Sequence, residues 1–377
     1  MKRFLRVAPV ALVCAASCFA AGQSAATGST PVSSTAGGAT APAPAASVDL
    51  NDWRAVRLDV VVTDKPGTPI KGLKAEDFTV LDNKQRQTVS VQEAGGPSLA
   101  GDNTVEAYVL IDTINPAEST VASERHDLTM YLGRAGHLPM PASLVFLTPD
   151  GLKIQGQSTR EASVLLANLE SNPTSLRTFQ NAGYYSAEAL REKSLMAMNV
   201  LAVKLAKRPG RKLVIWVSPG WREFIFQSSR MSRKDQEELF SYEASLSVAL
   251  RAARITLYSV DPNGAECVTC SRNSYYKNYL KGPYAPKDAD HNDLLLQALV
   301  AKTGGKVMTG KNDIASMIDD CLADAQHYYV LTFEAPPSVR ETTFHEIKVE
   351  VDKPGAQVRT RTGYYTLPEA QAEKAKP

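Results

Sequence analysis

A short apolar run that stops at a carboxylate constrains the fold of this chain more than any other feature. Residues 108–111 are apolar, Asp112 and Thr113 follow them, and a loop over residues 114–119 precedes a helical pattern. An apolar run this short, bounded by polar residues, is typical of a strand that is buried on both faces. In open α/β sheets, ligands bind just beyond the carboxyl ends of such strands. The sequence therefore predicts that Asp112 lies at a functional edge of a sheet.

Strands alternate with helices through the middle of the chain. Further apolar runs predict strands over residues 144–147, 212–217, 255–260 and 328–333, with a short hairpin mate at 152–154. Apolar residues at helical spacing predict helices over residues 187–207, 236–253, 294–302 and 314–326. This alternation predicts a mostly parallel sheet with helices on both faces, a Rossmann-like α/β domain over residues 104–334.

The two ends of the folded region instead have an antiparallel pattern. Apolar residues alternate with polar ones over residues 56–62 and 347–351, and an Asp-Lys-Pro-Gly turn follows each strand, at 64–67 and 352–355. Each piece alone has about three strands, which is marginal for independent stability. We therefore expect residues 51–96 and 342–367 to pair into one small antiparallel β-sandwich, with the α/β domain inserted between them.

The N-terminus has the pattern of an export signal. The pattern predicts a signal peptide over residues 1–21: a segment with three basic residues (1–6) is followed by an apolar stretch and then by small residues. The apolar part is too short to span a bilayer. The composition of residues 22–50 predicts a disordered linker, and residues 368–377 a disordered tail. The protein is expected to be periplasmic or extracellular. No lipid anchor is expected at Cys18, because the apolar residue usual three positions earlier is missing, and no further segment predicts a membrane span.

Export bears on the cysteines. In an oxidising compartment, Cys267 and Cys270 are expected to form a local disulfide or to remain two idle thiols, and Cys321 to be buried and free. A redox-active pair and a metal site are less favoured alternatives. A zinc site needs about four ligands, and the chain has no second pair of cysteines after the signal peptide.

Charge and motifs argue against two classes of function. The 42 basic and 40 acidic residues leave a net charge of +2, so we expect no nucleic-acid partner, which needs a concentrated basic face. The chain has no nucleophile-elbow, P-loop or zinc-protease motif, and Ile114 stands where a phosphoaspartyl hydrolase would need a second Asp. We therefore predict no catalytic residues and no enzyme.

Several motifs together resemble a known family. The Asp112-Thr113 loop, and the loops at residues 218–220 and 261–264 that close later strands, resemble a von Willebrand factor type A domain. The segments 60–64, 72–80, 210–212, 303–305 and 361–365 make the chain similar to the exported VWFA-related proteins of Acidobacteria, over roughly residues 53–367.

The resemblance implies a divalent-ion site, and the chain departs from its motif. The family's loop reads Asp-x-Ser-x-Ser, but Ile114 and Pro116 occupy the two Ser positions, and the loop at 218–220 lacks the family's carboxylate. We therefore predict a degenerate site without a cofactor, in which Asp112 accepts backbone N–H bonds from its loop or from the next helix. Mg²⁺ binding is the less favoured alternative, and its ligands would be Asp112, Asn115, Ser119 and Asp261.

The predicted function is that of an exported, non-enzymatic protein-binding module for adhesion or scaffolding. The expected contact residues lie at the top of the sheet and in a tyrosine-rich loop: Thr113, Asn115, Ser218, Tyr275, Tyr276 and Tyr279. Alternatively, that loop folds back and buries its rings. The alternative function is a secreted hydrolase with an unrecognised active site at the top of the sheet.

Overall fold

The computed structural model describes residues 55–95, 104–172, 184–221, 231–263, 275–335 and 342–366. The predicted signal peptide, the linker, the C-terminal tail and the pair Cys267 and Cys270 lie outside these residues. The described residues all belong to one compact unit, Ala46–Pro377. Within them, every helix is too short or too polar to traverse a bilayer.

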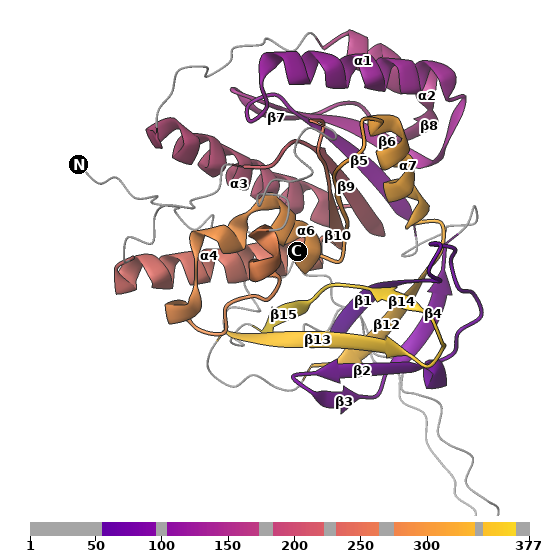
Figure 1. Cartoon of the computed structure of the whole chain (residues 1–377), viewed down its shortest axis with the longest axis vertical. Coiled ribbons are helices and arrows are strands. Elements are labelled where there is room, and N and C mark those ends of the chain that lie inside the picture. The colour runs from indigo at the N-terminus through magenta and orange to yellow at the C-terminus, as the bar shows by residue number, and fades with distance from the viewer. Residues whose placement is uncertain are drawn as a thin grey trace, which may run out of the picture. The chain divides into compact units, whose positions relative to one another are not determined.

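A seven-stranded, mostly parallel sheet forms the centre of the α/β part (Figure 1). Its path runs β11-β10-β9-β5-β6-β7, and β8 pairs with β6 beside this path. The parallel strands are β5 (Val105–Asp112), β6 (His137–Thr148), β9 (Arg211–Val217), β10 (Ile255–Val260) and β11 (Val307–Met308). Two short strands, β7 (Gly151–Ile154) and β8 (Thr159–Glu161), run antiparallel to β6.

Helices cover both faces of this sheet, because alternate strand residues point to opposite sides. On one side Val109 and Ile111 share a core with α1 (Glu118–Arg134), α2 (Ala162–Glu170) and α7 (Ile314–Ala323). On the other side Tyr108 and Leu110 share a core with α3 (Tyr184–Ala206), α4 (Arg233–Ala252) and α6 (Leu296–Lys302). Both faces of β5 are therefore buried, as its apolar sequence predicts. Three short 3₁₀ helices, η4 (Tyr276–Tyr279), η5 (Pro286–Asp288) and η6 (His291–Leu294), lie between β10 and α6 in the chain.

Strands from the two ends of the folded region form two four-stranded antiparallel sheets, ordered β14-β1-β12-β4 and β15-β13-β2-β3. The N-terminal strands are β1 (Ala55–Thr63), β2 (Phe78–Asp82), β3 (Gln85–Gln87) and β4 (Ser90–Ala94), with η1 (Ala75–Asp77) before β2. The C-terminal strands are β12 (Tyr328–Glu334), β13 (Thr343–Val351), β14 (Gln357–Arg359) and β15 (Gly363–Thr366). Val62 pairs with Val358, and Val80 pairs with Val349, so segments almost 300 residues apart share one core. The predicted fold class, an α/β sheet flanked by an antiparallel sandwich from both chain ends, is correct.

The sequence-based prediction placed one strand, β12, in the wrong sheet. The run at 328–333 was predicted to complete the α/β domain, but β12 pairs antiparallel with β1 and β4. Tyr328 and Val330 pack into the core beneath α1 and α7, whereas Tyr329 and Leu331 pack into the sandwich core. A strand covered on both sides has the same apolar pattern in either kind of sheet, which explains the wrong prediction. Because β12 pairs with β1 and β4, the α/β domain ends before β12.

Buried ion pairs join the antiparallel strands to the α/β part. Asp59 on β1 lies 2.9 Å from Arg254 and 3.7 Å from Arg211. Burial opposes ionisation of Asp59, but Arg254, Arg211 and Arg57 together lower the pKa of its carboxyl group. Asp324, just after α7, pairs with Arg359 on β14 and with Lys306. These contacts orient the sandwich strands on the α/β part.

Candidate binding site at the carboxyl edge of the sheet

The strand order places the predicted site at a topological switch point of the sheet. The chain passes from β5 to β6 on one side and later adds β9 on the other side of β5. The order therefore reverses between β5 and β9, and ligands of open α/β sheets bind outside the carboxyl ends of strands at such a point. We call the loops at this edge, residues 113–119, 218–220 and 261–263, the crest.

Asp112 ends β5 and is completely buried beneath the crest. Its Oδ1 accepts hydrogen bonds from the backbone N–H groups of Ile114 and Asn115, each at 3.1 Å. Its Oδ2 accepts from Asn115 Nδ2 at 2.7 Å and from Trp216 Nε1 at 3.0 Å. Asp112 therefore caps its own loop, whereas α1 begins after Ala117, which provides no side-chain cap.

The sequence reasoning overlooked Trp216. In the parallel pairing of β5 with β9, Leu110 lies beside Trp216, so the indole is on the same side of the sheet as Leu110 and Asp112. A buried indole N–H needs an acceptor, and Asp112 provides it. The signal was a tryptophan within the aliphatic run of residues 213–217, two residues before a loop that lacks a carboxylate.

These residues do not fit a divalent cation. A carboxylate has about four lone-pair sites, and N–H donors of this chain occupy all four on Asp112. Asp261 Oδ1 accepts from the backbone N–H of Asn263, and Ser119 is exposed on α1. Across the described ranges, no group of three His, Cys, Asp or Glu side chains is arranged to hold a metal. Mg²⁺ prefers oxygen ligands, so it would have to displace N–H groups of Asn115 or Trp216.

A second buried acid lies close to Asp112. Glu124 on the inner face of α1 has no exposed surface, and neither of its carboxyl oxygens has a hydrogen-bond partner. Burial, followed by the negative charges of Asp112, Asp261 and Asp127, raises the pKa of Glu124 well above its usual range. Burial also raises the pKa of Asp112, although Trp216 and Asn115 act in the opposite direction. Glu124 takes a core position of α1 beside Val121 and Leu128, which the helical spacing would have revealed.

Two of the predicted contact residues are not at the surface. Thr113 is buried and donates its hydroxyl to Leu147 O at 2.8 Å. Ser218 is fully buried, and its hydroxyl accepts from Gly220 N. The prediction that these two side chains contact a partner is therefore corrected, because their hydroxyl groups orient the crest from inside. Asn115 is half-buried, and its amide connects Asp112 to Ser194 on α3 at 2.9 Å.

The tyrosines in and beside η4 are neither fully exposed, as a contact surface would be, nor fully buried, as in a loop folded back over the sheet. Tyr275, Tyr276 and Tyr279 are half-buried. The hydroxyls of Tyr275 and Tyr279 lie 3.0 Å apart, their rings are 5.4 Å apart, and Asn292 donates to both hydroxyls. The cluster therefore folds back on η6 and keeps part of each ring at the surface.

Cys321 on α7 is buried and free, as expected. Burial, followed by the nearby Asp324 carboxylate, raises the pKa of its thiol, so the thiol stays protonated and unreactive.

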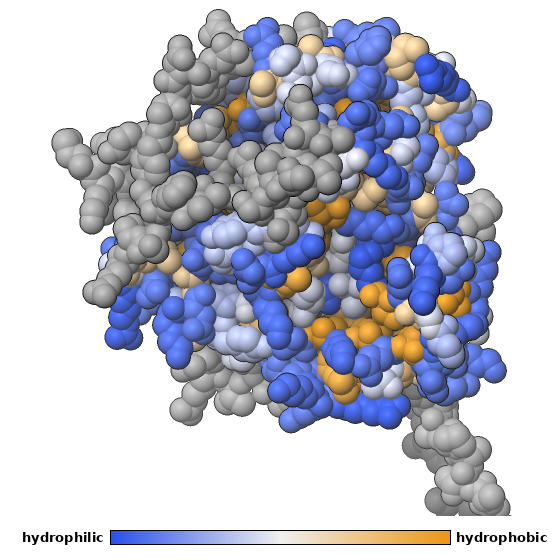
Figure 2. Space-filling view, in the orientation of Figure 1, coloured by the Kyte–Doolittle hydropathy of each residue, from blue (hydrophilic) through white to orange (hydrophobic). Residues whose placement is uncertain are grey.

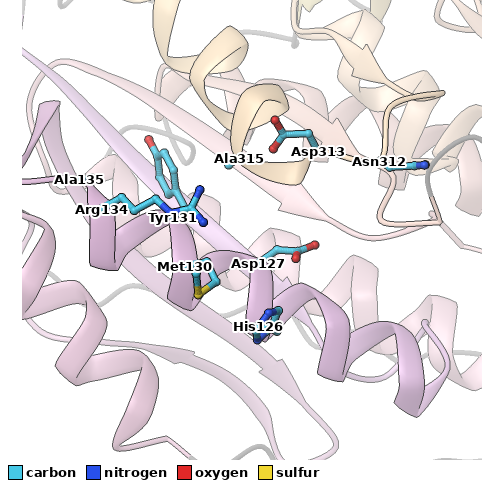
Figure 3. Close-up of a pocket in the computed structure, with 9 residues that line it drawn as sticks. All are labelled: His126, Asp127, Met130, Tyr131, Arg134, Ala135, Asn312, Asp313 and Ala315. Carbon is cyan, nitrogen blue, oxygen red and sulfur yellow. The ribbon is translucent and has the colours of Figure 1, made fainter.

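A surface pocket of about 570 Å³ lies away from the predicted residues, between α1 and the start of α7 (Figure 3). Its lining combines charged or polar residues of both signs with apolar ones such as Met130, Ala135 and Ala315. Tyr131 borders it and donates to Asp319 at 2.6 Å. None of the predicted site residues lines this pocket.

Surface hydropathy separates the two parts of the molecule on the face that Figure 2 shows. Hydrophobic residues gather over the antiparallel strands, whereas α1 and α4 present mainly hydrophilic residues. The partly buried apolar residues of these strands include Val349, Val351 and Val358, which pack against the sandwich core.

Among the comparisons with known proteins, only the search of solved structures found similar proteins. No family model and no curated protein matches the chain. Among solved structures, it is similar to the SpRpn10 VWA domain, at 8% identity and a TM-score of 0.30, over 57% of this chain and 94% of that one. It is also similar to the manganese-loaded TRAP protein of Plasmodium vivax, at 10% identity and a TM-score of 0.30, over 74% of this chain and 99% of that one. The α/β architecture described above rests on the strand order of this chain itself.

Proposed function

We propose that this chain is an exported, non-enzymatic protein-binding module of von Willebrand factor type A kind, with an adhesion or scaffolding role. Its metal site is degenerate, and its crest binds a protein partner without a cation. The N-terminal export pattern supports a periplasmic or extracellular location. The near balance of basic and acidic residues favours a protein partner over a nucleic acid.

The observation that carries this proposal is the saturation of Asp112. In a cation-dependent site the carboxylate needs free lone pairs, directly or through a bound water. Here two backbone N–H groups, the Asn115 amide and the Trp216 indole use them. The crest is thus held in one conformation by internal hydrogen bonds, and a preorganised surface loses less entropy on binding.

The surface available to a partner differs from the sequence prediction. Glu118 and Ser119 at the start of α1 and Asn263 after β10 are exposed at the crest. Thr120 Oγ1 lies 3.5 Å from Asn263 Oδ1, which brings the two loops together. The partly exposed rings of Tyr275, Tyr276 and Tyr279 provide a second contact region, because tyrosine is enriched at protein interfaces.

Calorimetric titration tests the degenerate metal site. We expect no binding heat when Mg²⁺ or Mn²⁺ is added to the purified chain up to millimolar concentration. Binding in that range that disappears in Asp112→Asn would contradict the proposal.

Capture from envelope extract tests the binding role. The immobilised chain is expected to retain the same protein in EDTA and in Mg²⁺, and Ser119→Arg is expected to lose it. The control is Ser245→Arg, which places the same side chain at an exposed serine of α4. Capture that requires Mg²⁺, or equal loss in both variants, would refute a cation-independent crest.

A further inference from the structure

The outward face of α3 carries an apolar stripe that stays exposed in the part of the chain that the structure describes. Met196, Val200 and Val203 are 56%, 39% and 58% exposed. Their spacing of four and three residues puts them on one side of the helix. In the part of the chain that the structure describes, they are half of the six large apolar side chains that are exposed. A surface helix normally has polar residues there, so this face is suited to an interface.

The opposite face of the same helix packs against the core. Leu195, Met198, Leu201 and Leu205 are buried against the parallel sheet. The outward stripe is therefore not needed for packing against the core. We expect polar substitutions on it to leave the packing of α3 intact.

The charges beside the stripe are self-complementary. Glu192 precedes Met196 by four residues on α3, and Lys207, the first residue after the end of α3, follows Val203 by four. Both side chains are exposed. In a second copy that lies antiparallel across the stripe, Met196 faces Val203 of its mate and Glu192 faces Lys207 at both ends. With a rise of about 1.5 Å per residue, these groups lie at matching heights along the helix axes. A parallel arrangement would instead place Lys207 against Lys207.

We propose that two copies of this chain form a homodimer through antiparallel pairing of their α3 helices. A two-fold axis needs a patch that complements itself, and this stripe with opposite charges at its ends is such a patch. One helix face buries less than the ~1,200 Å² of a standard interface, so we expect a dissociation constant on the order of 10 µM. The inference goes beyond the proposed binding role and does not depend on it. A dimer would present two crests to a multivalent partner.

Sedimentation velocity of the full chain tests the dimer, across concentrations from about 1 to 200 µM, a range that brackets the expected constant. The wild type is expected to pass from monomer to dimer over this range. Val203→Glu is expected to raise the dissociation constant at least tenfold. Val164→Glu is the matched control, because Val164 is an exposed valine on α2 (47%), away from the stripe, and it is expected to leave the constant unchanged.

A charge exchange tests the antiparallel geometry. Glu192→Lys and Lys207→Glu are each expected to weaken the dimer several-fold, and the double variant is expected to restore it. Circular dichroism melting of each variant verifies that the fold is kept. A wild type that stays monomeric at the highest concentration overturns the proposal. This holds even if the stripe proves to bind lipid vesicles or another protein and Val203→Glu abolishes that binding. A double variant weaker than both single variants overturns the antiparallel arrangement.

Discussion

Replacing Glu124 with leucine is expected to stabilise the protein. Glu124 is fully buried on α1, neither carboxyl oxygen has a hydrogen-bond partner, and three carboxylates raise its pKa further. A buried polar group without a partner costs about 1–3 kcal/mol, and an apolar residue of similar volume removes that cost. We therefore expect Glu124→Leu to raise the free energy of unfolding at pH 7 by about 1–3 kcal/mol, or roughly 2–6 °C in Tm.

The sign of the pH dependence follows from the direction of the pKa shift. The folded-state pKa of Glu124 lies above its ordinary value of 4.5, so the folded chain binds the proton more tightly than the unfolded chain. Stability linked to this group is highest below pH 4.5 and falls as the pH rises toward the folded-state pKa. Glu124→Gln cannot ionise, so its stability relative to the wild type should be smallest below pH 4.5 and should increase as the pH rises above that value.

Urea unfolding followed by tryptophan fluorescence measures both effects, because Trp216 and Trp221 are buried near the crest. Glu118→Gln is the control, since Glu118 is exposed in the first turn of the same helix and should show neither effect. A Glu124→Leu variant that is less stable than the wild type would refute the reasoning. It would mean that Glu124 has a polar partner in solution, such as a bound ion.

Three further predictions concern the hydrogen bonds and strand pairings that hold the crest and the sandwich. Trp216→Phe removes a donor to Asp112 and should cost about 1.5–3 kcal/mol in urea unfolding, with much less effect in an Asp112→Asn background; equal effects in both backgrounds would argue against the bond. Asp59→Asn breaks a buried pair with Arg254 and should cost about 3 kcal/mol at neutral pH. The lowered pKa of Asp59 makes its stabilisation complete above pH 3.8 and lost as the pH falls, so an acid titration followed by circular dichroism should show a flatter acid limb in this variant; an unchanged limb would contradict the assignment. Deletion after residue 341 removes the β13 partner of β2 and should abolish cooperative calorimetric melting of the N-terminal strands; an unchanged transition would show that they fold alone.

The parallel sheet could be predicted because burial on both faces leaves an unambiguous apolar run. The runs at 108–111, 212–217 and 255–260 correspond to β5, β9 and β10. The helix predicted over 187–207 is α3, Tyr184–Ala206. Boundaries elsewhere shifted by a few residues, as with α4, which begins at Arg233 after a Ser232 cap. These elements depend on local pattern, which a single sequence contains.

The partner strands of β12 could not be predicted in the same way. Its residues alternate between two cores, so its sequence reads as apolar throughout. The choice between a parallel and an antiparallel neighbour depends on contacts with β1, more than 260 residues earlier. Local pattern contains no information on that pairing, whereas the two Asp-Lys-Pro-Gly turns did indicate which chain ends come together.

The sequence shows that positions 114 and 116 offer no side-chain oxygen, but it does not show why position 112 carries a carboxylate. Four donors from the loop and β9 converge on this one side chain, and Asn115 extends the network to Ser194 on α3. An alanine at this position would leave two backbone N–H groups, an amide and an indole buried without acceptors, which is far costlier than losing one hydrogen bond. The acid is thus needed by the fold itself. The position of an acid at the end of β5 is therefore not by itself a sign of a bound cation, because the Trp216 indole and three other N–H donors already occupy its carboxylate.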